Sequence, residues 1–366
     1  MSVLNKRKYI VTVINSITET SMPYNEFVLY RLNVFPKDKQ LVIVCSKSIP
    51  KGLVIPKGLD LYFVGNSLIK INKIMKQVEK DCKVNRMNFI IHLHQPKSAT
   101  LFNISMLFSN FKKRSVFTVH SLYDAYDSKN KFLSVLSVLL ARRVTCVSEA
   151  SYNHYPELIK KVKGDNMISL RNGVDLKRIE NAIHSKEAPN TSIKTLIYVA
   201  RMIPIKNHEF LIKVFSQLSG CRLILIGAED KNGEIRKLVE AEKLSDRVEF
   251  SGLIPRDKVF KKLGQADIYV SPSTVEGLPV SVLEAMYVGL PVVISDIEPH
   301  KEIGIYDKSV VTLPLDEIKW IQILENYINL DKKSLTQIGN NCKECAEKYF
   351  SLDNMLKQFD ELYEML

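Results

Sequence analysis

The sequence has no apolar run long enough to cross a bilayer, which requires about 20 residues. Its longest apolar stretch, at 132–141, is about half that length, and we expect it to form a buried helix. The basic and apolar start resembles a signal peptide, but Asn15 and Ser16 interrupt it and no small-residue cleavage site follows. We therefore predict a first strand there. The chain also lacks internal repeats and low-complexity segments, and its composition is that of a globular protein.

The six cysteines show no disulfide or metal-binding pattern. Cys45, Cys146 and Cys221 lie in strand-like runs, where we expect buried thiols. Cys342 and Cys345 form a C-x-x-C pair, but no second pair or histidine partner follows at metal spacing. The cysteines therefore favour a reducing, cytoplasmic compartment and disfavour zinc.

The net charge of +12 is unevenly spread. Residues 1–190 hold 30 Lys/Arg and 14 Asp/Glu, whereas residues 191–366 hold 22 and 26. A strongly basic half can face nucleic acid, anionic lipid or a phosphorylated substrate. Its lysines are scattered and not interleaved with aromatic residues, which disfavours nucleic acid as a partner.

Short β-rich runs alternate with helical patterns along the whole chain, which predicts parallel sheets covered by helices on both faces. With 366 residues, the chain suits two doubly wound α/β domains facing across a cleft. The expected strands are 9–15, 41–45, 61–64, 88–94, 115–120 and 143–147 in one half, and 194–200, 221–227, 247–252, 266–271, 291–295 and 309–313 in the other.

The domain boundaries follow from a polar stretch without strand character. We expect an N-terminal domain at 1–175, a linker region at 176–193 and a second domain at 194–345. The last residues, 346–366, are expected to form a C-terminal helix that packs back on the N-terminal domain.

Charged residues follow the first strand of the second half. Arg201 ends that strand, and Lys206 precedes a helix with Asn207 as a plausible N-cap. Two cations beside a helix N-terminus form an anion site, because free amides and the helix dipole add to the side-chain charge. The alternative is two solvated surface cations.

A second group of charged residues follows the expected strand at 266–271, in the stretch "IYVSPSTVEGLPVSVLE". Glu276 lies in the loop before a helix, Pro279 fits the first helical position, and Glu284 lies in the second turn. Strand ends of one parallel sheet share an edge, so these acids and the helix amides could meet the cations. A diphosphate between cations and amides would leave one sugar for each carboxylate.

The spacing R-x4-K followed about 70 residues later by E-x7-E resembles the family-four retaining glycosyltransferases of GT-B fold. The stretch 271–296 is similar to their donor motif over its full length, and "VSEAS", "RNGVD", "VEFSGLI" and "ADIYVSPS" support it in order over most of 115–305. Many relatives have a glycine pair after the first strand, but the loop at 15–27 has none. Relatives often have glycine where this chain has Ala200.

The resemblance implies roles for the residues already singled out. Arg201 and Lys206 would hold the donor diphosphate, Glu284 the ribose, and Glu276 the transferred sugar near the reacting carbon. The remaining donor contacts would come from Gly252 and Ile254 near the base and from the helix start at Gly277, Leu278, Pro279 and Val280.

The first half would bind the acceptor. His120 ends a strand, and in the family a histidine there lies near the donor sugar and β-phosphate. His92 and His94 share one face of a strand end, which we interpret as lining of the site. With no glycine at 15–27, acceptor contacts there would come from Ser21, Tyr24 or Asn25.

The resemblance further implies a nucleotide-sugar co-substrate, with UDP favoured over GDP, and no cofactor. No D-x-D motif occurs, so the two cations would replace a bridging metal ion. Retention would proceed by same-face substitution, or by a covalent intermediate for which Asp124 and Asp127 are the candidates.

Most similar enzymes build capsule, exopolysaccharide or lipopolysaccharide on a lipid carrier, so a glycan or polyprenyl-linked acceptor is expected. The alternatives are a nucleotide-sugar epimerase of GT-B fold, which would convert donor alone, and a nucleic-acid-binding module.

The segment 68–83 predicts an amphipathic helix with Leu68, Ile71, Met75 and Val78 near one stripe and five flanking lysines. It could bind an anionic membrane peripherally at the inner face of the cell membrane, or simply pack on the sheet.

Overall fold

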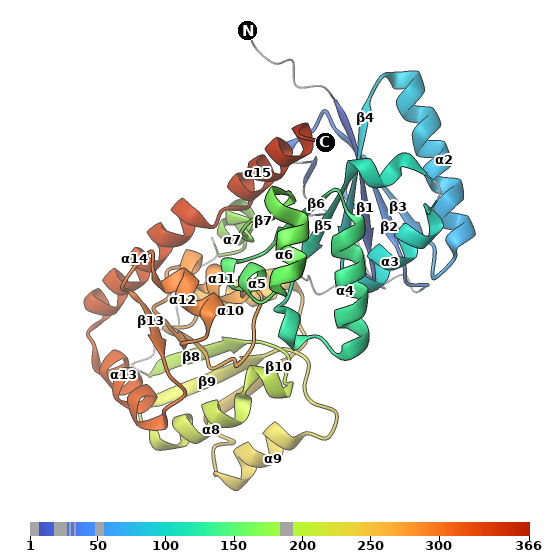
Figure 1. The fold of residues 1–366 in the computed structure, drawn as a ribbon. Coiled ribbons are helices and arrows are strands. Elements are labelled where there is room, and N and C mark those ends of the chain that lie inside the picture. The colour runs from blue at the N-terminus through green and yellow to red at the C-terminus, as the bar shows by residue number, and fades with distance from the viewer. Residues whose placement is uncertain are drawn as a thin grey trace. The chain divides into compact units, whose positions relative to one another are not determined.

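The computed structural model describes residues 7–17, 28, 31–32, 34–47, 55–107, 109–183 and 193–366. The chain divides into two compact units, one formed by 1–171 with 353–366 and the other by 172–352. Each unit contains one parallel β-sheet with helices between successive strands (Figure 1). The predicted fold class, two doubly wound α/β units with a helical C-terminus, is confirmed.

The sheet of the first unit has seven strands in the order β3-β2-β1-β4-β5-β6-β7, and every pairing between them is parallel. The order reverses between β1 and β4, which makes their carboxyl ends the switch point where ligands bind in such sheets. The strands are β1 (Lys8–Ile14), β2 (Lys39–Val44), β3 (Leu59–Phe63), β4 (Asn88–His94), β5 (Ser115–Val119), β6 (Arg143–Cys146) and β7 (Met167–Ser169).

Helices cover this sheet, and β1 is buried along its whole length. A strand buried on both faces can be apolar throughout, which explains why its sequence does not alternate. The helical elements are α2 (Leu68–Asn85), α3 (Pro96–Ser105), η1 (Asn110–Arg114), η2 (Tyr123–Ala125), α4 (Ser128–Leu140), α5 (Glu149–Asn153), α6 (Glu157–Lys163), η3 (Gly164–Asn166) and α15 (Leu352–Glu364).

The sheet of the second unit has six strands in the order β10-β9-β8-β11-β12-β13, again all parallel, with its switch point between β8 and β11. The strands are β8 (Lys194–Val199), β9 (Cys221–Ile226), β10 (Val248–Gly252), β11 (Ile268–Ser271), β12 (Val292–Ser295) and β13 (Val310–Leu313). The helical elements are α7 (Leu176–Ile183), η4 (Pro204–Lys206), α8 (His208–Gln217), α9 (Glu234–Ala241), α10 (Arg256–Gly264), α11 (Val280–Val288), α12 (Glu298–Gly304), α13 (Glu317–Asn329) and α14 (Lys332–Tyr349).

All twelve expected strands are present, and in the described part of the chain the three-residue β7 is the one strand that the sequence did not predict. Within the stretch 176–193, the first residues form α7, whose Ile179 is fully buried and which packs on α10 and α11. Residues 184–192 lie outside the described part. The cysteines are buried free thiols, as predicted for Cys45, Cys146 and Cys221.

Helix α2 places its apolar stripe in the core of the first unit. Ile71, Met75 and Val78 are almost completely buried there, while Leu68 is 37% exposed. The five lysines of this helix are exposed. The apolar stripe of α2 is therefore used for packing on the sheet, and its lysines are presented to solvent together with Ile69 and Val84.

Helix α4 corrects the expectation of a buried helix at 132–141. The helix is present, but its buried side chains include Ser134, Ser137 and Val138, whereas Phe132 and Leu139 are 68% and 43% exposed. Hydrophobicity alone could not reveal this, because an apolar run does not show which of its faces meets the rest of the unit.

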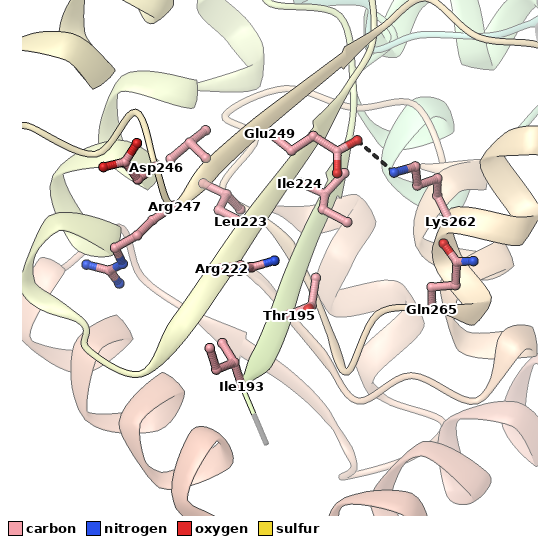
Figure 2. Close-up of a pocket in the computed structure, with 11 residues that line it drawn as sticks. Ile193, Thr195, Arg222, Leu223, Ile224, Asp246, Arg247, Glu249, Lys262 and Gln265 are labelled. Carbon is pink, nitrogen blue, oxygen red and sulfur yellow. Dashed lines mark hydrogen bonds and ion pairs between the residues drawn. The ribbon is translucent and has the colours of Figure 1, made fainter. Parts of the chain in front are cut away.

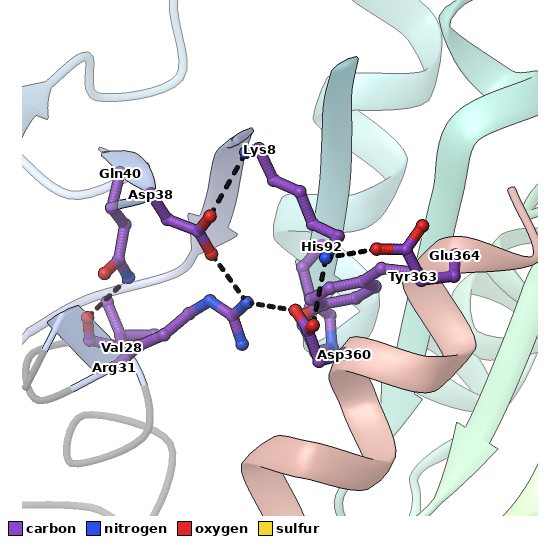
Figure 3. Close-up of polar contacts among 9 residues, drawn as sticks. All are labelled: Lys8, Val28, Arg31, Asp38, Gln40, His92, Asp360, Tyr363 and Glu364. Atoms are coloured by element: carbon purple, nitrogen blue, oxygen red, sulfur yellow. Dashed lines mark hydrogen bonds and ion pairs between the residues drawn. The ribbon is translucent and has the colours of Figure 1, made fainter. Parts of the chain in front are cut away.

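A buried polar cluster joins the C-terminal helix α15 to the first sheet (Figure 3). Asp360 accepts hydrogen bonds from the Lys8 ammonium and the Arg31 guanidinium, each at 2.9 Å. Asp38 binds the same guanidinium at 3.0 Å, and Glu364 contacts Lys8. Arg31 is fully buried, so its charge depends on these carboxylates to offset the loss of water.

We expect Asp360→Asn to destabilise the first unit by about 3 kcal/mol, because it removes the negative charge that Lys8 and Arg31 share. Each of these buried cations keeps one other carboxylate, Glu364 for Lys8 and Asp38 for Arg31. Urea denaturation followed by far-UV circular dichroism measures this change. The fluorescence of Trp320, the single tryptophan, reports the second unit separately. The control is Glu364→Gln, whose side chain is 47% exposed and which should change stability by less than about 1 kcal/mol. Equal effects of the two variants would show that the buried cluster does not depend on Asp360.

Candidate active site

The switch point of the second sheet brings one predicted cation, Lys206, and one predicted carboxylate, Glu276, together. Lys206 ends η4 after β8, and Glu276 lies in the loop after β11. The Lys206 ammonium contacts the Glu276 carboxylate, and both side chains are mostly buried. The backbone amide of Thr274 also donates to the Ile205 carbonyl at 2.9 Å, so the two loops are joined directly.

A polar network beneath these loops holds them in place. The Tyr198 hydroxyl donates to the Lys206 carbonyl at 2.9 Å and lies 2.9 Å from the hydroxyl of Ser273. Ser295 donates to the Ser273 carbonyl, and its hydroxyl lies 3.0 Å from Nδ1 of His300. Burial raises the pKa of Tyr198 well above 10, so the phenol remains a neutral donor. The sequence analysis did not identify this network, because its members are spread over about 100 residues.

Arg201 differs from Lys206 in its surroundings. Its side chain is exposed and has no acidic partner among the described residues. The backbone after β9 passes very close to the residue before Arg201, because a Cβ at Gly227 would lie 2.0 Å from the Ala200 carbonyl oxygen. Gly227 also has φ +148°, a conformation that favours glycine. The neighbouring Gly252 accepts from the Gly227 amide at 2.9 Å, which aligns the ends of β8, β9 and β10.

The start of α11 faces the same switch point. The helix begins at Val280 with Pro279 as its N-cap, so the expectation that Pro279 is the first helical residue is wrong by one position. The amides of Val282 and Leu283 are already bonded to the Pro279 carbonyl. Amides of the first turn have no helical acceptor, which leaves Val280 and Ser281 as donors here, and the amide of Leu278 lies just before the N-cap.

Glu284 lies deeper than the sequence suggested. It is fully buried, and its carboxylate contacts the guanidinium of Arg256, the first residue of α10. A ribose at this carboxylate would have to share it with Arg256 or replace that contact. Arg256 was missed because it follows β10 and contacts Glu284 only through the packing of α10 on α11. Ile254 precedes it in the loop after β10, where Leu253 is 61% exposed.

The first unit presents three histidines at the carboxyl ends of β4 and β5. His92 and His94 stack with ring centroids 4.0 Å apart, and Nδ1 of His94 lies 2.9 Å from Nε2 of His120. The two ring nitrogens of His92 lie 2.6 Å from the Tyr363 hydroxyl and from the Thr118 hydroxyl. Burial lowers the pKa of His120 to about 4 and the pKa values of His92 and His94 well below 6.5. The cluster is therefore neutral at physiological pH and acts through hydrogen bonds.

Gln95 is a second feature of this edge that the sequence analysis missed. Its φ of +68° is unusual for a residue other than glycine, and its side-chain oxygen accepts from the Asn15 amide at 2.8 Å. That bond joins the ends of β4 and β1 at the switch point of the first sheet. Strained backbone of this kind is often found at functional sites. The predicted acceptor residues Ser21, Tyr24 and Asn25 lie outside the described residues.

The second unit also contains a pocket of about 470 Å³ at the amino ends of β8, β9 and β10 (Figure 2). Thr195, Arg222 and Glu249 line it, and Lys262 contributes an ammonium 2.7 Å from Glu249. It lies at the opposite strand ends from Arg201 and Glu276. Within the described part of the chain, no cluster of three or more His, Cys, Asp or Glu side chains is arranged to bind a metal ion.

Residues 179–344 match the family model described as glycosyl transferases group 1. The resemblance identified from the motifs is thereby confirmed for this part of the chain, which lies within the second unit and makes up less than half of the sequence. This match covers all of the donor-side residues described above.

Individual proteins support the same assignment. The chain is 29% identical over 207 residues to the putative colanic acid biosynthesis glycosyltransferase WcaL of Escherichia coli K12, covering 54% of this chain and 50% of that one. It is 23% identical over 370 residues to the Escherichia coli UDP-Gal:alpha-D-GlcNAc-diphosphoundecaprenol alpha-1,3-galactosyltransferase, covering 92% of each. The chain spans only 50% to 61% of the length of the first curated relatives that it matches.

Solved structures confirm the fold. Sucrose-phosphate synthase from Thermosynechococcus elongatus superposes with a TM-score of 0.79 at 18% identity, covering 98% of this chain and 99% of that one. At this identity the similarity establishes the GT-B type of fold and nothing about substrates.

The buried histidines of the second unit predict acid sensitivity. Burial lowers the pKa values of His208 and His300 to about 4, whereas the unfolded chain holds them near 6.5. Between these values the unfolded state binds more protons, so stability is lost as pH falls below about 6.5. We expect the free energy of unfolding to drop by about 2 kcal/mol per histidine from pH 7 to pH 5.

Urea unfolding followed by Trp320 fluorescence at both pH values measures this loss. His208→Leu removes one of the two titrating histidines. It should therefore reduce the loss of unfolding free energy between pH 7 and pH 5 by about half of what the two histidines contribute together. An unchanged difference in that variant would contradict the assignment of the acid sensitivity to His208.

Proposed function

We propose that this protein is a retaining glycosyltransferase that moves a sugar from a nucleotide-diphosphate donor to a glycan acceptor in cell-surface polysaccharide synthesis. The observation that carries the proposal is the contact between Lys206 and Glu276 at the switch point of the second sheet, at the strand edge that Arg201 and the start of α11 also follow. The match of 179–344 to group 1 glycosyl transferases supports it. The relative named for colanic acid biosynthesis supports the polysaccharide context.

The donor diphosphate would replace Glu276 as the partner of Lys206. In the structure these two side chains neutralise each other, whereas Arg201 remains exposed. A diphosphate brings about two negative charges, which Arg201, Lys206 and the amides of Leu278 and Val280 can bind together. Glu276, released from Lys206, then accepts hydrogen bonds from hydroxyls of the transferred sugar.

The same groups would stabilise the charge that develops on the leaving diphosphate. Donors oriented in advance toward a developing charge are typically worth about 3–4 kcal/mol each. Two side-chain cations in this position make a bridging metal ion unnecessary, and we propose a metal-independent transfer. UDP is the proposed nucleotide, because a relative that covers 92% of the chain is named for UDP-Gal.

We propose that the anomeric configuration of the transferred sugar is retained by substitution on the same face of the sugar. The acceptor oxygen bonds to the anomeric carbon as the bond to the diphosphate breaks, and the leaving diphosphate takes the acceptor proton. A covalent route would need a free carboxylate nucleophile. The two candidates have structural partners: Asp127 accepts from the Asn130 amide at 2.7 Å as the cap of α4, and Asp124 lies 2.8 Å from His154.

The first unit would bind the acceptor. Neutral His120, held by His94, can hydrogen-bond a sugar hydroxyl without adding charge. We propose a glycan or polyprenyl-linked acceptor, because the relative named above uses a diphosphoundecaprenol substrate by its name. In the described residues no helix has both the length and the apolar character needed to span a bilayer. We place the reaction at the cytoplasmic face of an anionic membrane, reached peripherally.

The diphosphate contact is tested with Arg201→Ala and Lys206→Ala. Each should weaken UDP-sugar binding about tenfold or more, since each removes a charge-assisted hydrogen bond. Lys206→Ala should lose more, because it also leaves Glu276 as an unpaired carboxylate beside the diphosphate. The double variant Lys206→Ala/Glu276→Gln should therefore bind free UDP better than Lys206→Ala alone. Calorimetry with UDP, GDP and ADP and their sugars measures the affinities of the unmodified protein and of the three variants.

Lys262→Ala is the matched control, because this lysine pairs with Glu249 at the pocket of the opposite strand ends. It should leave donor binding unchanged. Unaltered donor affinity in both the Arg201 and Lys206 variants would refute the site. Conversion of donor in the absence of any acceptor would instead identify an epimerase.

The two carboxylates should differ in what they bind. Glu276→Gln should slow transfer more than it weakens free UDP, because Glu276 is assigned to the sugar. Glu284→Gln should weaken free UDP, because Glu284 is assigned to the ribose. Since Glu284 is buried against Arg256, thermal stability must be followed in parallel.

A double variant separates the two effects of Glu284. Arg256→Leu/Glu284→Leu removes both members of a buried pair, which is often close to neutral for stability. If this folded protein binds UDP as tightly as the unmodified chain, Glu284 has only a structural role and the ribose assignment is wrong.

A further inference from the structure

Helix α4 turns an apolar stripe toward solvent. Phe132 and Leu139 are seven residues apart and share a face, and both are strongly exposed. Val135 and Leu136, between them on that face, are partly exposed. The opposite side carries the buried serines, one of which bonds the Tyr155 hydroxyl. The helix therefore presents its apolar face outward, the reverse of the usual arrangement.

Helix α6 continues this surface. Leu158 and Val162 are four residues apart on one face and are 71% and 63% exposed. The two helices are in contact, and Figure 1 shows them as neighbours on the first unit. We call the outward side of α4 and α6 the α4–α6 face. Contiguous exposed apolar surface of this kind marks an interaction site.

The α4–α6 face borders a pocket rich in cations. A hollow of about 310 Å³ lies between the C-terminal ends of the two helices, lined by Lys113, Arg142 and Lys163 as well as Leu139 and Val162. Lys163 is 9% exposed and donates to the Ala141 carbonyl at 2.6 Å. Burial, together with Arg142 and Arg143, lowers the pKa of this lysine. An anion in the hollow would offset the repulsion among these cations.

The carboxylates of this region do not neutralise the cations of the pocket. Glu157 pairs with Lys160 at 2.6 Å, and Asp127 caps α4. The remaining acid of these elements, Asp165, is exposed on η3. Among the described residues, Lys113, Arg142 and Lys161 have no acidic partner within ion-pair distance.

We propose that the α4–α6 face docks on an anionic phospholipid bilayer, with its apolar side chains in the interface and a lipid phosphate in the pocket lined by Lys113, Arg142 and Lys163. This deepens the proposed function, on which it rests for its biological sense, by naming the surface that reaches the membrane. Exposed apolar residues among lysines are the composition of interfacial helices. Cations near the surface are attracted to anionic headgroups.

Two observations favour this occupant and surface over others. A second copy of the chain pairing through a twofold axis would place the same cations opposite each other, at an electrostatic cost. Helix α2 carries as many lysines, but its apolar stripe is buried in the core and cannot enter a bilayer. Its strongly exposed apolar side chains, Ile69 and Val84, lie at opposite ends of the helix and form no continuous apolar surface. The α4–α6 face combines exposed apolar and cationic side chains.

Vesicle co-sedimentation of the full chain tests the proposal, with phosphatidylcholine vesicles containing or lacking phosphatidylglycerol. The unmodified protein should bind only the anionic vesicles at low salt, and soluble glycerol phosphate should not compete. Lys113→Glu/Arg142→Glu/Lys161→Glu should reduce binding about tenfold or more. Phe132→Ser/Leu139→Ser should weaken the binding that remains at high salt.

Matched changes on α2 serve as controls. Lys73→Glu/Lys76→Glu/Lys80→Glu makes the same change in charge, and Ile69→Ser/Val84→Ser alters equally exposed apolar side chains of that helix. Both should retain most of the binding. UDP binding by calorimetry should be the same in all variants, which separates a failure of docking from a failure of the proposed transferase function.

The proposal is overturned if the unmodified protein does not bind anionic vesicles at low salt. It is equally overturned if the α2 variants lose as much binding as the α4–α6 variants. A dimer in solution that Phe132→Ser/Leu139→Ser converts to a monomer, without vesicle binding, would assign the face to a second copy instead.

Discussion

The parallel alignment of β8 with β11 is the constraint on which the candidate site depends. Ile268 pairs with Leu196 and Tyr269 with Ile197, although about 70 residues separate the two strands in the chain. Parallel pairing puts both carboxyl ends on one edge, so the loops after the two strands must meet. The contact between Lys206 and Glu276 and the bond from Thr274 to Ile205 follow from that register.

Most of the charged side chains named at this edge form ion pairs. Lys206 is bound to Glu276 and Glu284 to Arg256, whereas Arg201 is exposed. Removing charges from water is costly unless each has a partner, so the mostly buried cation and carboxylate of each pair stabilise each other. Under the proposed function, a diphosphate would supply a new partner for Lys206 and would leave Glu276 for sugar hydroxyls.

The first unit uses the same principle for stability. Arg31 and Lys8 are buried against Asp38, Asp360 and Glu364, and these bonds hold α15 against the first sheet. The histidines of β4 and β5 stay neutral because burial lowers their pKa values. His92 also bonds Tyr363 of α15, so the last helix of the chain supports the edge that carries His94 and His120.

The sequence by itself determined every described strand except β7, and the parallel α/β class, because continuous apolar runs are local properties. It also located the charged residues in the loops after the strands. Tertiary structure alone decided which charges touch: the contacts Lys206–Glu276 and Glu284–Arg256 join residues far apart in the chain, and no spacing rule contains them. It also decided which side of an apolar helix is buried. The stripe of α2 enters the core and that of α4 faces solvent, because packing against neighbouring elements, not composition, selects the face that loses its water.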